Sequence, residues 1–326
     1  MEVCMRILYF TDTHIKGTNP KNRKDDFLES LQEKFREIVS IVRENNVDFV
    51  IHGGDLFDRP DISTSVVSRF TTILKNIEKP IFIVSGNHDI FGHNPATIDR
   101  TMLGLLKSMD FIKVISRDKP IVIEKNGIRV SLTSLPYTYD IDSTPEGYIL
   151  KEVPENMDYS IHVVHGMLLD RPFVKGIPYT LIDDILETAA DITLSGHYHA
   201  GFKTIEKNGK YFVNPGSLVR VTNSLKEIER IPQVAIIDLD SDIKVEMLQL
   251  TSAKPGIEVL DRTEMENCMF RSERIVQFKQ SIDSAMSFEK MDLNDILLEV
   301  TLSEGVSDEV KEEALRRIAN SQMKGY

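Results

Sequence analysis

The chain has 326 residues, of which 41% are hydrophobic and 28% are charged. This length suits one large domain with a small appendage, and no apolar run approaches the roughly 18–20 residues that a membrane span needs. The formal net charge of −12 argues against a general electrostatic DNA-binding surface, because phosphate contacts need clustered Lys and Arg, although bound divalent cations or a basic partner would add positive charge that the count omits.

The N-terminus and the cysteines both favour a cytoplasmic protein. The apolar part of "MEVCMRILYF" is too short for a signal peptide, and Asp12 follows it closely. Cys4 and Cys268 lie far apart and neither belongs to a CxxC pair, so we expect no disulfide framework and no cysteine metal site. A reducing, cytoplasmic setting is therefore expected.

The first part of the chain predicts a parallel α/β core. Runs of β-forming residues predict strands over 4–10, 47–52 and 80–85. Apolar residues at helical spacing predict helices over 25–45 and 63–77, the second capped by Ser63 or Thr64. Alternation of strands and helices indicates βαβ units.

The second part is richer in strands and is expected to form a second sheet that faces the first. Hairpins turning at Asn126-Gly127 and Asn208-Gly209, strands over 159–166 and 191–199, a helix over 177–189 and a closing strand pair over 232–250 are predicted. We expect two facing mixed sheets flanked by helices, an α/β class.

A domain boundary is expected near residues 251–256. Residues 1–255 would form the main domain, and residues 256–326 a small α+β appendage for capping or for partner binding. A charged helix is predicted over 307–322.

Polar side chains follow the predicted core strands at their carboxyl ends, where sites form in open α/β sheets. They are Asp12, His14, Asp55, Asn87, His88, His165, His197 and His199. Residues i and i+2 of a strand face the same way, so the D-x-H and H-x-H spacings direct both side chains of each pair to one place. Taken singly, such residues also serve as caps and turn residues; taken together they indicate a site.

Seven of these residues carry carboxylate, amide and imidazole groups that bind divalent metal ions, and they are too many for one ion. If Asp55 bridges, each of two ions has four ligands. One ion would be bound by Asp12, His14, Asp55 and His199, and the other by Asp55, Asn87, His165 and His197. These ligands suit Mn, Fe or Zn better than Ca.

The stretches "DTH", "GGDLFD", "GNHD", "HG" and "GHYH", in this order, resemble the five motifs of calcineurin-like metallophosphoesterases over roughly residues 5–250. This resemblance implies a four-layered α/β sandwich. "GGDLFDRPDIS", and "GHYH" followed by "NPGSLVR", further resemble the SbcD-type DNA repair nucleases in a compact, phage-like form. That likeness implies Mn²⁺, with Mg²⁺, Fe²⁺ and Zn²⁺ left open, an SbcC-type coiled-coil ATPase partner, and a homodimer formed through helical surfaces near residues 63–107.

The expected chemistry is phosphodiester hydrolysis. Two ions would hold a bridging water and lower its pKa, and the resulting hydroxide would attack phosphorus in line. His88, left without a metal, would protonate the leaving oxygen, and a hydrogen bond from Asp58 would hold it and keep it charged. Arg59, Lys16 and Arg23 are candidate substrate contacts, each with the alternative of a solvated surface group.

Three functions stay open at this point. The leading one is a DNA exo- and endonuclease of an SbcC/SbcD-type repair or recombination complex. The alternative is a phosphodiesterase or phosphatase acting on small molecules or phosphoproteins, because "GDLFDR" also echoes the GDxxDR of protein phosphatases. The third is a catalytically silent scaffold, against which the full ligand set argues. His52 and His162 are interpreted as core or supporting histidines, and His93 as a loop residue.

Overall fold

The computed structural model describes residues 5–117 and 119–263, together with the single residues 266, 274 and 313. By its contacts the chain divides after Asp261, and the description below concerns the first unit. The appendage expected over 256–326, with its charged helix, lies almost wholly outside the described residues. The domain boundary near residue 255 therefore stays a prediction.

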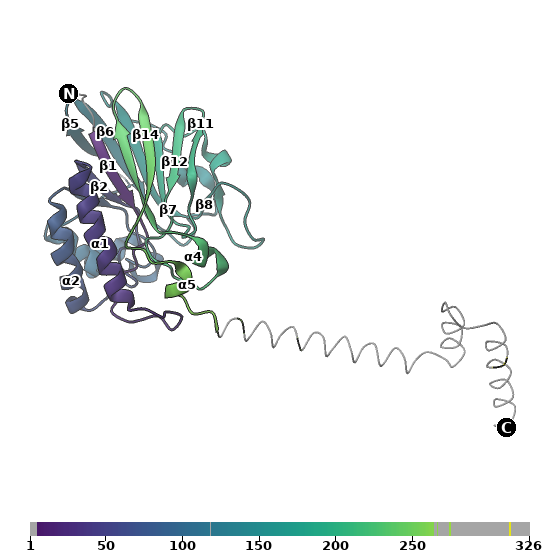
Figure 1. Cartoon of the computed structure of the whole chain (residues 1–326). Coiled ribbons are helices and arrows are strands. Elements are labelled where there is room, and N and C mark those ends of the chain that lie inside the picture. Colours follow the sequence, from purple (N-terminus) through teal and green to yellow (C-terminus); the bar gives the residue numbers. More distant parts are fainter. Residues whose placement is uncertain (1–4, 118, 264–265, 267–273, 275–312, 314–326) are drawn as a thin grey trace. The chain divides into compact units, whose positions relative to one another are not determined.

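Two mixed sheets of six strands form the centre of this unit (Figure 1). The first sheet has the order β14-β13-β1-β2-β3-β4, and its strands are β1 (Met5–Phe10), β2 (Phe49–His52), β3 (Ile81–Ile83), β4 (Lys113–Val114), β13 (Gln233–Leu239) and β14 (Ile243–Gln249). The second has the order β11-β12-β10-β7-β6-β5, and its strands are β5 (Ile121–Lys125), β6 (Ile128–Leu135), β7 (Tyr159–Gly166), β10 (Ile192–His197), β11 (Phe202–Lys207) and β12 (Lys210–Asn214). Strands β8 (Leu168–Leu169) and β9 (Thr180–Leu181) form a small separate pair.

Each sheet has a parallel centre. Strands β1, β2, β3 and β4 run parallel, as do β6, β7, β10 and β12. The remaining strands are antiparallel additions at the edges. All carboxyl ends of the parallel strands in a sheet therefore lie along one edge, where a site can form.

The helices are short except for the first two, which lie side by side against the first sheet (Figure 1). The α-helices are α1 (Phe27–Glu44), α2 (Thr64–Leu74), α3 (Met102–Ser108), α4 (Leu225–Glu229) and α5 (Gly256–Val259), and the 3₁₀ turns are η1 (Lys75–Ile77), η2 (Phe91–His93), η3 (Pro95–Arg100), η4 (Pro145–Tyr148) and η5 (Ile182–Ile185). Helix α1 begins where the Asp26 carboxylate accepts a hydrogen bond from the Glu29 amide, 3.0 Å away.

Three apolar clusters hold the layers together. Along β1, Leu8 and Phe10 pack against α1 and α2, whereas Ile7 and Tyr9 face the second sheet. This alternation follows from the two-residue period of a strand, and apolar residues on both sides mark strands that are buried on both faces. A third cluster, which includes Tyr148, covers the outer face of the second sheet. The predicted four-layered arrangement of two facing mixed sheets is confirmed.

Two local predictions were wrong. The closing pair, β13 and β14, does not join the second sheet, because β13 pairs antiparallel with β1, with Met5 opposite Leu239. Strand β13 is apolar on both faces, which suits an interior position in the first sheet. The helix expected over 177–189 is instead strand β9 followed by the single turn η5.

Within the part of the chain that the structure describes, no helix combines the length and the apolar character that a membrane crossing requires.

A buried Asp and His cluster as the candidate metal centre

The carboxyl ends of five strands bring the seven predicted ligands together. Asp12 and His14 follow β1, Asp55 follows β2, Asn87 follows β3, His165 lies near the end of β7, and His197 and His199 lie at and after the end of β10. The loops after β1 and β2 are tied to each other, since the amides of Thr13 and His14 both donate to the Asp55 carbonyl at 3.0 Å. The two sheets thus contribute to one site at a shared edge.

Asp12, His14, Asp55 and His199 form one group, in which one ligand atom from each residue lies within 4.8 Å of the others. The Nε2 atoms of His14 and His199 are 3.1 Å apart, and His199 Nε2 is 3.4 Å from Asp12 Oδ1. Asp12, His14 and Asp55 are buried, with at most 2% of each residue exposed. This is the first of the two predicted ligand sets.

Asp55, His165 and His197 form a second group of the same kind. The Asn87 amide oxygen lies beside it, 3.3 Å from His165 Nε2 and 3.0 Å from His197 Nδ1. The His165 ring is fixed by its other nitrogen, because Nδ1 lies 2.7 Å from the Gly53 carbonyl, to which it donates. A main-chain partner of this kind sets the tautomer and leaves Nε2 free as a ligand.

Asp55 belongs to both groups. Its Oδ1 accepts a hydrogen bond from the His88 amide at 2.8 Å. Its Oδ2 is buried and has no hydrogen-bond partner among the described residues, yet it lies 3.7 Å from His14 Nε2 and 3.3 Å from His165 Nε2. A buried carboxylate oxygen without a hydrogen bond is costly unless a cation faces it, so the residues present fit divalent metal ions.

The backbone at the site is strained. Asp12, His14, Asp55 and His197 all have positive φ, between 41° and 72°, although residues with a Cβ rarely adopt this conformation. Each such residue costs of the order of 1–3 kcal/mol and persists only where the surrounding structure imposes it. Strain concentrated on four predicted ligands is typical of a functional site.

Gly54 shows why this edge requires glycine. Its φ is +102°, and a Cβ at this position would collide with the His165 ring. The glycine that precedes Asp55 in "GGD" therefore permits both the turn and the close approach of two strands at the site.

The two carboxylates are held ionised. Burial alone would raise the pKa of Asp12, but the hydrogen bond to His199 and the nearby imidazoles lower it well below its usual value. Burial likewise opposes ionisation of Asp55, and the charge of the nearby His165 outweighs it, so that this pKa is lowered too. Both residues are therefore available as anionic ligands at neutral pH.

The imidazoles fall into two classes. Burial lowers the pKa of His14 and of His197 to about 4 in each case, so both rings are neutral at pH 7. Burial also disfavours the charged form of His165, but the negative charge of Asp55 outweighs burial and raises the pKa of His165 to about 9. In His199, the hydrogen bond to Asp12 outweighs burial and raises the pKa of that ring. A proton on His165 thus balances part of the acidic charge, and a bound cation would take its place.

His88 stands next to this cluster and is half-buried. Its ring packs edge-on against that of His14, with centroids 4.7 Å apart. Its Nδ1 donates to the main-chain carbonyl of Asp58 at 2.7 Å, whereas the Asp58 carboxylate lies 3.1 Å from Lys16 Nζ. His88 thus donates to the Asp58 main chain, and the Asp58 carboxylate, which was expected to hold the ring and keep it charged, contacts Lys16 instead.

The three candidate substrate contacts are placed differently. Lys16 pairs with Asp58 beside the cluster, and Arg59 is largely exposed and pairs with Asp61. Arg23 is buried and directs its guanidinium to the Asp25 carboxylate through two hydrogen bonds. Only Lys16 and Arg59 thus lie where a solvent-borne substrate can reach them.

Sequence reasoning missed several residues that shape the site. The Ser217 hydroxyl donates to the Asp12 carbonyl at 2.7 Å, and the Asp89 carboxylate accepts from the amides of Gly86 and Phe57. The Tyr137 ring lies 5.2 Å from that of His197. Asp89 and Ser217 were visible inside "GNHD" and "NPGS", but only the fold shows what they contact.

A profile of the calcineurin-like phosphoesterase family matches residues 5–201, which is well over half of the chain and includes all seven residues of the cluster. The protein belongs to the calcineurin-like phosphoesterases. The fold is that of this family, and its buried Asp and His cluster is able to bind metal ions.

Several relatives of this chain are DNA repair proteins. It is 25% identical to the double-strand break repair protein MRE11 of Encephalitozoon cuniculi over 292 residues, covering 77% of this chain and 48% of that protein. It is 27% identical to the DNA double-strand break repair protein Mre11 of Sulfurisphaera tokodaii, covering 60% of this chain and 49% of that protein. The chain thus spans about half the length of these relatives.

Among solved structures, the chain resembles the calcineurin-like phosphoesterase YfkN from Bacillus subtilis, with a TM-score of 0.51 and 14% identity, over 85% of this chain and 99% of that one. A 5'-nucleotidase structure from Staphylococcus aureus gives a TM-score of 0.50 at 15% identity, over 76% of this chain and 54% of that one. At such identities these structures support the fold alone.

Proposed function

We propose that this protein is a metal-dependent DNA nuclease of the SbcD type, which hydrolyses phosphodiester bonds within a DNA repair or recombination complex. The observation that carries the proposal is the buried Oδ2 of Asp55, which lies between two sets of ligand atoms and has no hydrogen bond within the part of the chain that the structure describes. Relatives named for double-strand break repair support DNA as the substrate.

We assign the seven residues to two divalent ions bridged by Asp55, and we propose Mn²⁺ as the metal, with Mg²⁺, Fe²⁺ and Zn²⁺ as alternatives. Asp12, His14 and His199 would complete one ligand set, and Asn87, His165 and His197 the other. When bound, such a pair of cations lowers the pKa of water and neutralises charge on a phosphate.

His88 is proposed as the general acid. The Asp58 carbonyl can only accept a hydrogen bond, so Nδ1 of His88 carries a proton, and Nε2 is the nitrogen through which a proton would reach the leaving oxygen. The edge-on contact with His14 fixes the ring beside the ligand cluster. His88 therefore acts on the departing group in this proposal, and the seven ligands act on the phosphate.

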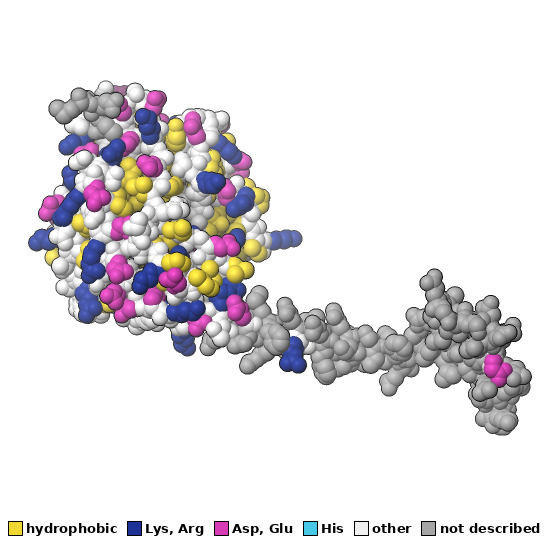
Figure 2. All heavy atoms as spheres, viewed as in Figure 1, with side chains coloured by type: hydrophobic (Ala, Val, Ile, Leu, Met, Phe, Trp, Pro, Cys, Tyr) yellow, Lys and Arg dark blue, Asp and Glu magenta, His cyan; other side chains and the backbone are white. Residues whose placement is uncertain are grey.

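DNA would approach over the loop that follows β2. A cavity of about 490 Å³ there is lined by Lys16, Asp58, Arg59, Ser63 and Arg69, among others. Three of these residues are cationic, and hydroxyl groups lie next to them, which suits a phosphate backbone. Elsewhere the surface is mixed: on the face in Figure 2, Lys and Arg side chains are interspersed with Asp and Glu.

We also propose a homodimer through α2 and α3. These helices form a groove of about 460 Å³ that is lined by Val67, Met102, Leu105, Met109 and Phe111, among others. Leu105 and Met109 are 45% and 67% exposed, which is unusual for large apolar side chains that cluster. A second copy of this surface would cover them. The SbcC-type ATPase partner stays a prediction from the resemblance.

The test uses the purified chain with Mn²⁺ and two substrates: a labelled linear DNA and bis(p-nitrophenyl) phosphate. We expect both to be hydrolysed, and we expect His88→Ala to lower kcat on DNA by about 10²–10⁴-fold. Its effect should be smaller on the chromogenic ester, because nitrophenolate leaves without a proton. Metal content should remain that of the wild type.

Two other outcomes would each favour a different function. Hydrolysis of the chromogenic ester alone would favour the alternative function, a phosphodiesterase or phosphatase acting on small molecules or phosphoproteins. No hydrolysis of either substrate with any divalent cation would favour the silent scaffold.

A further inference from the structure

We propose that His93, Tyr137 and Tyr139 form a stacking platform that binds an unpaired nucleobase of the substrate beside the metal centre. This inference rests on the proposed function and extends it to the substrate class. The three residues are called the aromatic platform below. None of them belongs to the seven ligands, and the chemistry proposed above does not use them.

The platform begins at the cluster and leads outward ring by ring. The Tyr137 ring is 5.2 Å from His197 and 6.3 Å from His165, centroid to centroid. His93 packs edge-on against Tyr137 at 5.2 Å, and Tyr139 lies nearly parallel to His93, at 6.4 Å with an interplanar angle of 26°. Four rings in sequence therefore join a predicted ligand, His197, to the surface.

The outer end of the platform is open. Tyr139 is 86% exposed, and no hydrogen bond to its hydroxyl occurs within the described residues. A tyrosine held at the surface gains little from burial, so its place beside another ring at the mouth of a site needs a different reason. Both faces of a nucleobase are π surfaces, and stacking on Tyr or His accepts any base.

The loop that carries the tyrosines is fixed at both ends. The Tyr137 amide donates to the Ser85 carbonyl at 3.2 Å, just before the "GNHD" motif. At the other end the Asp142 carboxylate accepts hydrogen bonds from Tyr148, Met167 and Thr180, at 2.6, 3.0 and 3.1 Å. The loop that carries both tyrosines is therefore held at its two ends before a substrate binds, which lowers the entropic cost of binding.

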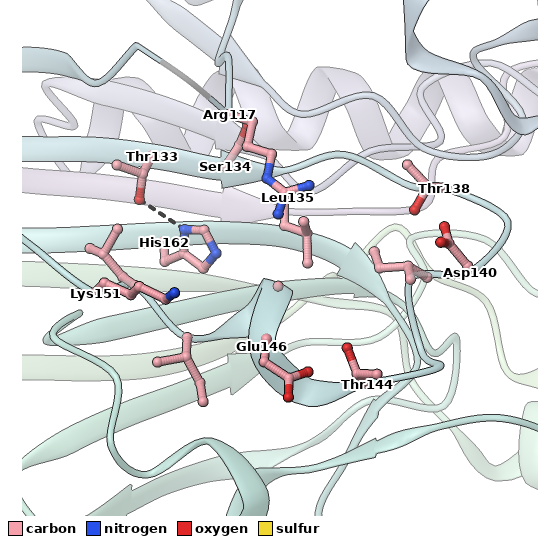
Figure 3. Close-up of a pocket in the computed structure, with 14 residues that line it drawn as sticks. Arg117, Thr133, Ser134, Leu135, Thr138, Asp140, Thr144, Glu146, Lys151 and His162 are labelled. Carbon is pink, nitrogen blue, oxygen red and sulfur yellow. Dashed lines mark hydrogen bonds between the residues drawn. The ribbon is translucent and has the colours of Figure 1, made fainter.

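Neighbouring side chains of the same loop point to a different space. Thr138 and Asp140 line a cavity of about 410 Å³ on the outer face of the second sheet, together with Leu135 and His162 (Figure 3). Tyr137 and Tyr139 alternate with them: the Tyr137 ring contacts that of His197, and the Tyr139 ring lies against that of His93. This loop, which turns at residues 139 and 140, thus lies between the cavity and the site, with Tyr137 beside His197 and Tyr139 beside His93.

The platform implies a substrate with an exposed base. In a duplex, each base has its faces covered by neighbours in the stack, and removing it from the stack costs a few kcal/mol. A base in the interior of a duplex can therefore lie on Tyr139 only after it has left the stack. We therefore infer that the site takes single-stranded DNA or a frayed end, with one base on the platform.

The experiment compares two octamers of equal length and charge, one of deoxyadenosine and one fully abasic, on the wild type, Tyr139→Ala and Tyr139→Phe. We expect Tyr139→Ala to lower kcat/KM on the deoxyadenosine octamer by about 5- to 100-fold, the range for one stacked base. Tyr139→Phe should keep most of the activity. The abasic octamer should be a poor substrate for all three proteins, with no further loss in Tyr139→Ala.

Controls separate this inference from the proposed function. Manganese content reports the metal centre and should match that of the wild type in both variants, and Val122→Ala, which changes an exposed apolar side chain on β5, should behave as the wild type throughout. Binding of labelled octamers with the metal chelated needs no cleavage, and the wild type should prefer the deoxyadenosine octamer. Equal binding of the two octamers, or an equal loss on both in Tyr139→Ala, would overturn the platform even where DNA is cleaved.

Discussion

At the scale of single residues, Asp55 is the position on which the site depends. Its Oδ2 lies near nitrogen atoms of both ligand sets and has no hydrogen bond to any described residue, while its Oδ1 accepts one from the amide of His88. One side chain therefore links the two halves of the cluster and the proposed acid. No other residue of the seven belongs to both ligand sets.

Asp55→Asn should remove both ions, because it replaces a shared anionic ligand by a neutral amide. We expect the metal content to fall from two equivalents of Mn²⁺ to fewer than one, measured by plasma mass spectrometry after dialysis. Asp61→Asn, on an exposed residue paired with Arg59, should retain both. Two tightly bound ions in Asp55→Asn would exclude the bridging role.

Gly54→Ala tests the close approach of the backbone to His165 without replacing any of the seven ligands. A Cβ here would require a residue with φ of +102° and would meet the His165 ring. We expect a loss of about 3 kcal/mol or more in the free energy of unfolding, measured in urea. Gly127→Ala, at φ +84° with nothing near its Cβ position, should cost only about 1 kcal/mol. Equal losses in the two variants would show that His165 imposes no constraint.

At the scale of elements, the loop after β12 is held by a buried lysine of α1. Lys34 is 2% exposed, and its Nζ donates to the Leu218 carbonyl at 3.0 Å. The hydroxyl of the neighbouring residue, Ser217, donates to the Asp12 carbonyl, and the Leu218 amide donates to the Thr11 carbonyl. Helix α1 thus supports Asp12 indirectly: Lys34 holds Leu218, and the adjacent Ser217 holds the Asp12 backbone.

Lys34 also makes stability depend on pH. Burial, followed by the charges of neighbouring arginines, lowers its pKa to about 7. Between pH 7 and the unfolded-state value near 10.5, the unfolded chain binds a proton that the folded chain lacks, so the folded state gains stability as the pH rises. Between pH 7 and 9 we expect the unfolding free energy of the wild type to rise relative to Lys34→Met by about 1 kcal/mol per pH unit. A difference that does not change with pH would contradict this.

The elements differ in how far the sequence predicted them. The strands before the metal motifs and the helix α1 were predicted closely, because their apolar periodicity reflects burial that the residues themselves specify. The partner of β13 was not predicted, since an apolar strand fits the interior of either sheet, and the structure pairs it with β1. The segment 177–189 shows apolar spacing that suits a helix, yet Thr180 and Leu181 pair with β8 instead.

The candidate site, too, was predicted from the sequence only in part. Seven ligand positions followed from strand ends and from family motifs, and all seven meet at one edge. Contacts made through the backbone, such as that of the Asp58 carbonyl with His88, could not be predicted from the sequence. Residue identity carries no information about which carbonyl faces a ring. Tyr137 and Tyr139 lie in no recognised motif, and only the fold brings them beside His197 and His93.

At the scale of the whole molecule, the apolar groove between α2 and α3 predicts self-association. Leu105→Asp places a charge among Met102, Met109 and Phe111 and should abolish the proposed dimer. Light scattering at micromolar concentration should give a dimer for the wild type and a monomer for the variant, with ester hydrolysis retained. Val122→Asp, on the exposed edge strand β5, should remain a dimer. A wild-type monomer at these concentrations would refute the proposed interface.

The most direct test of the two-ion site is a crystal structure grown with excess Mn²⁺ and measured at the manganese absorption edge. We predict two anomalous peaks, one on each side of Asp55 Oδ2, the first bound by Asp12, His14 and His199 and the second by Asn87, His165 and His197. A single peak, or peaks away from Asp55, would contradict the two-ion site and the chemistry derived from it.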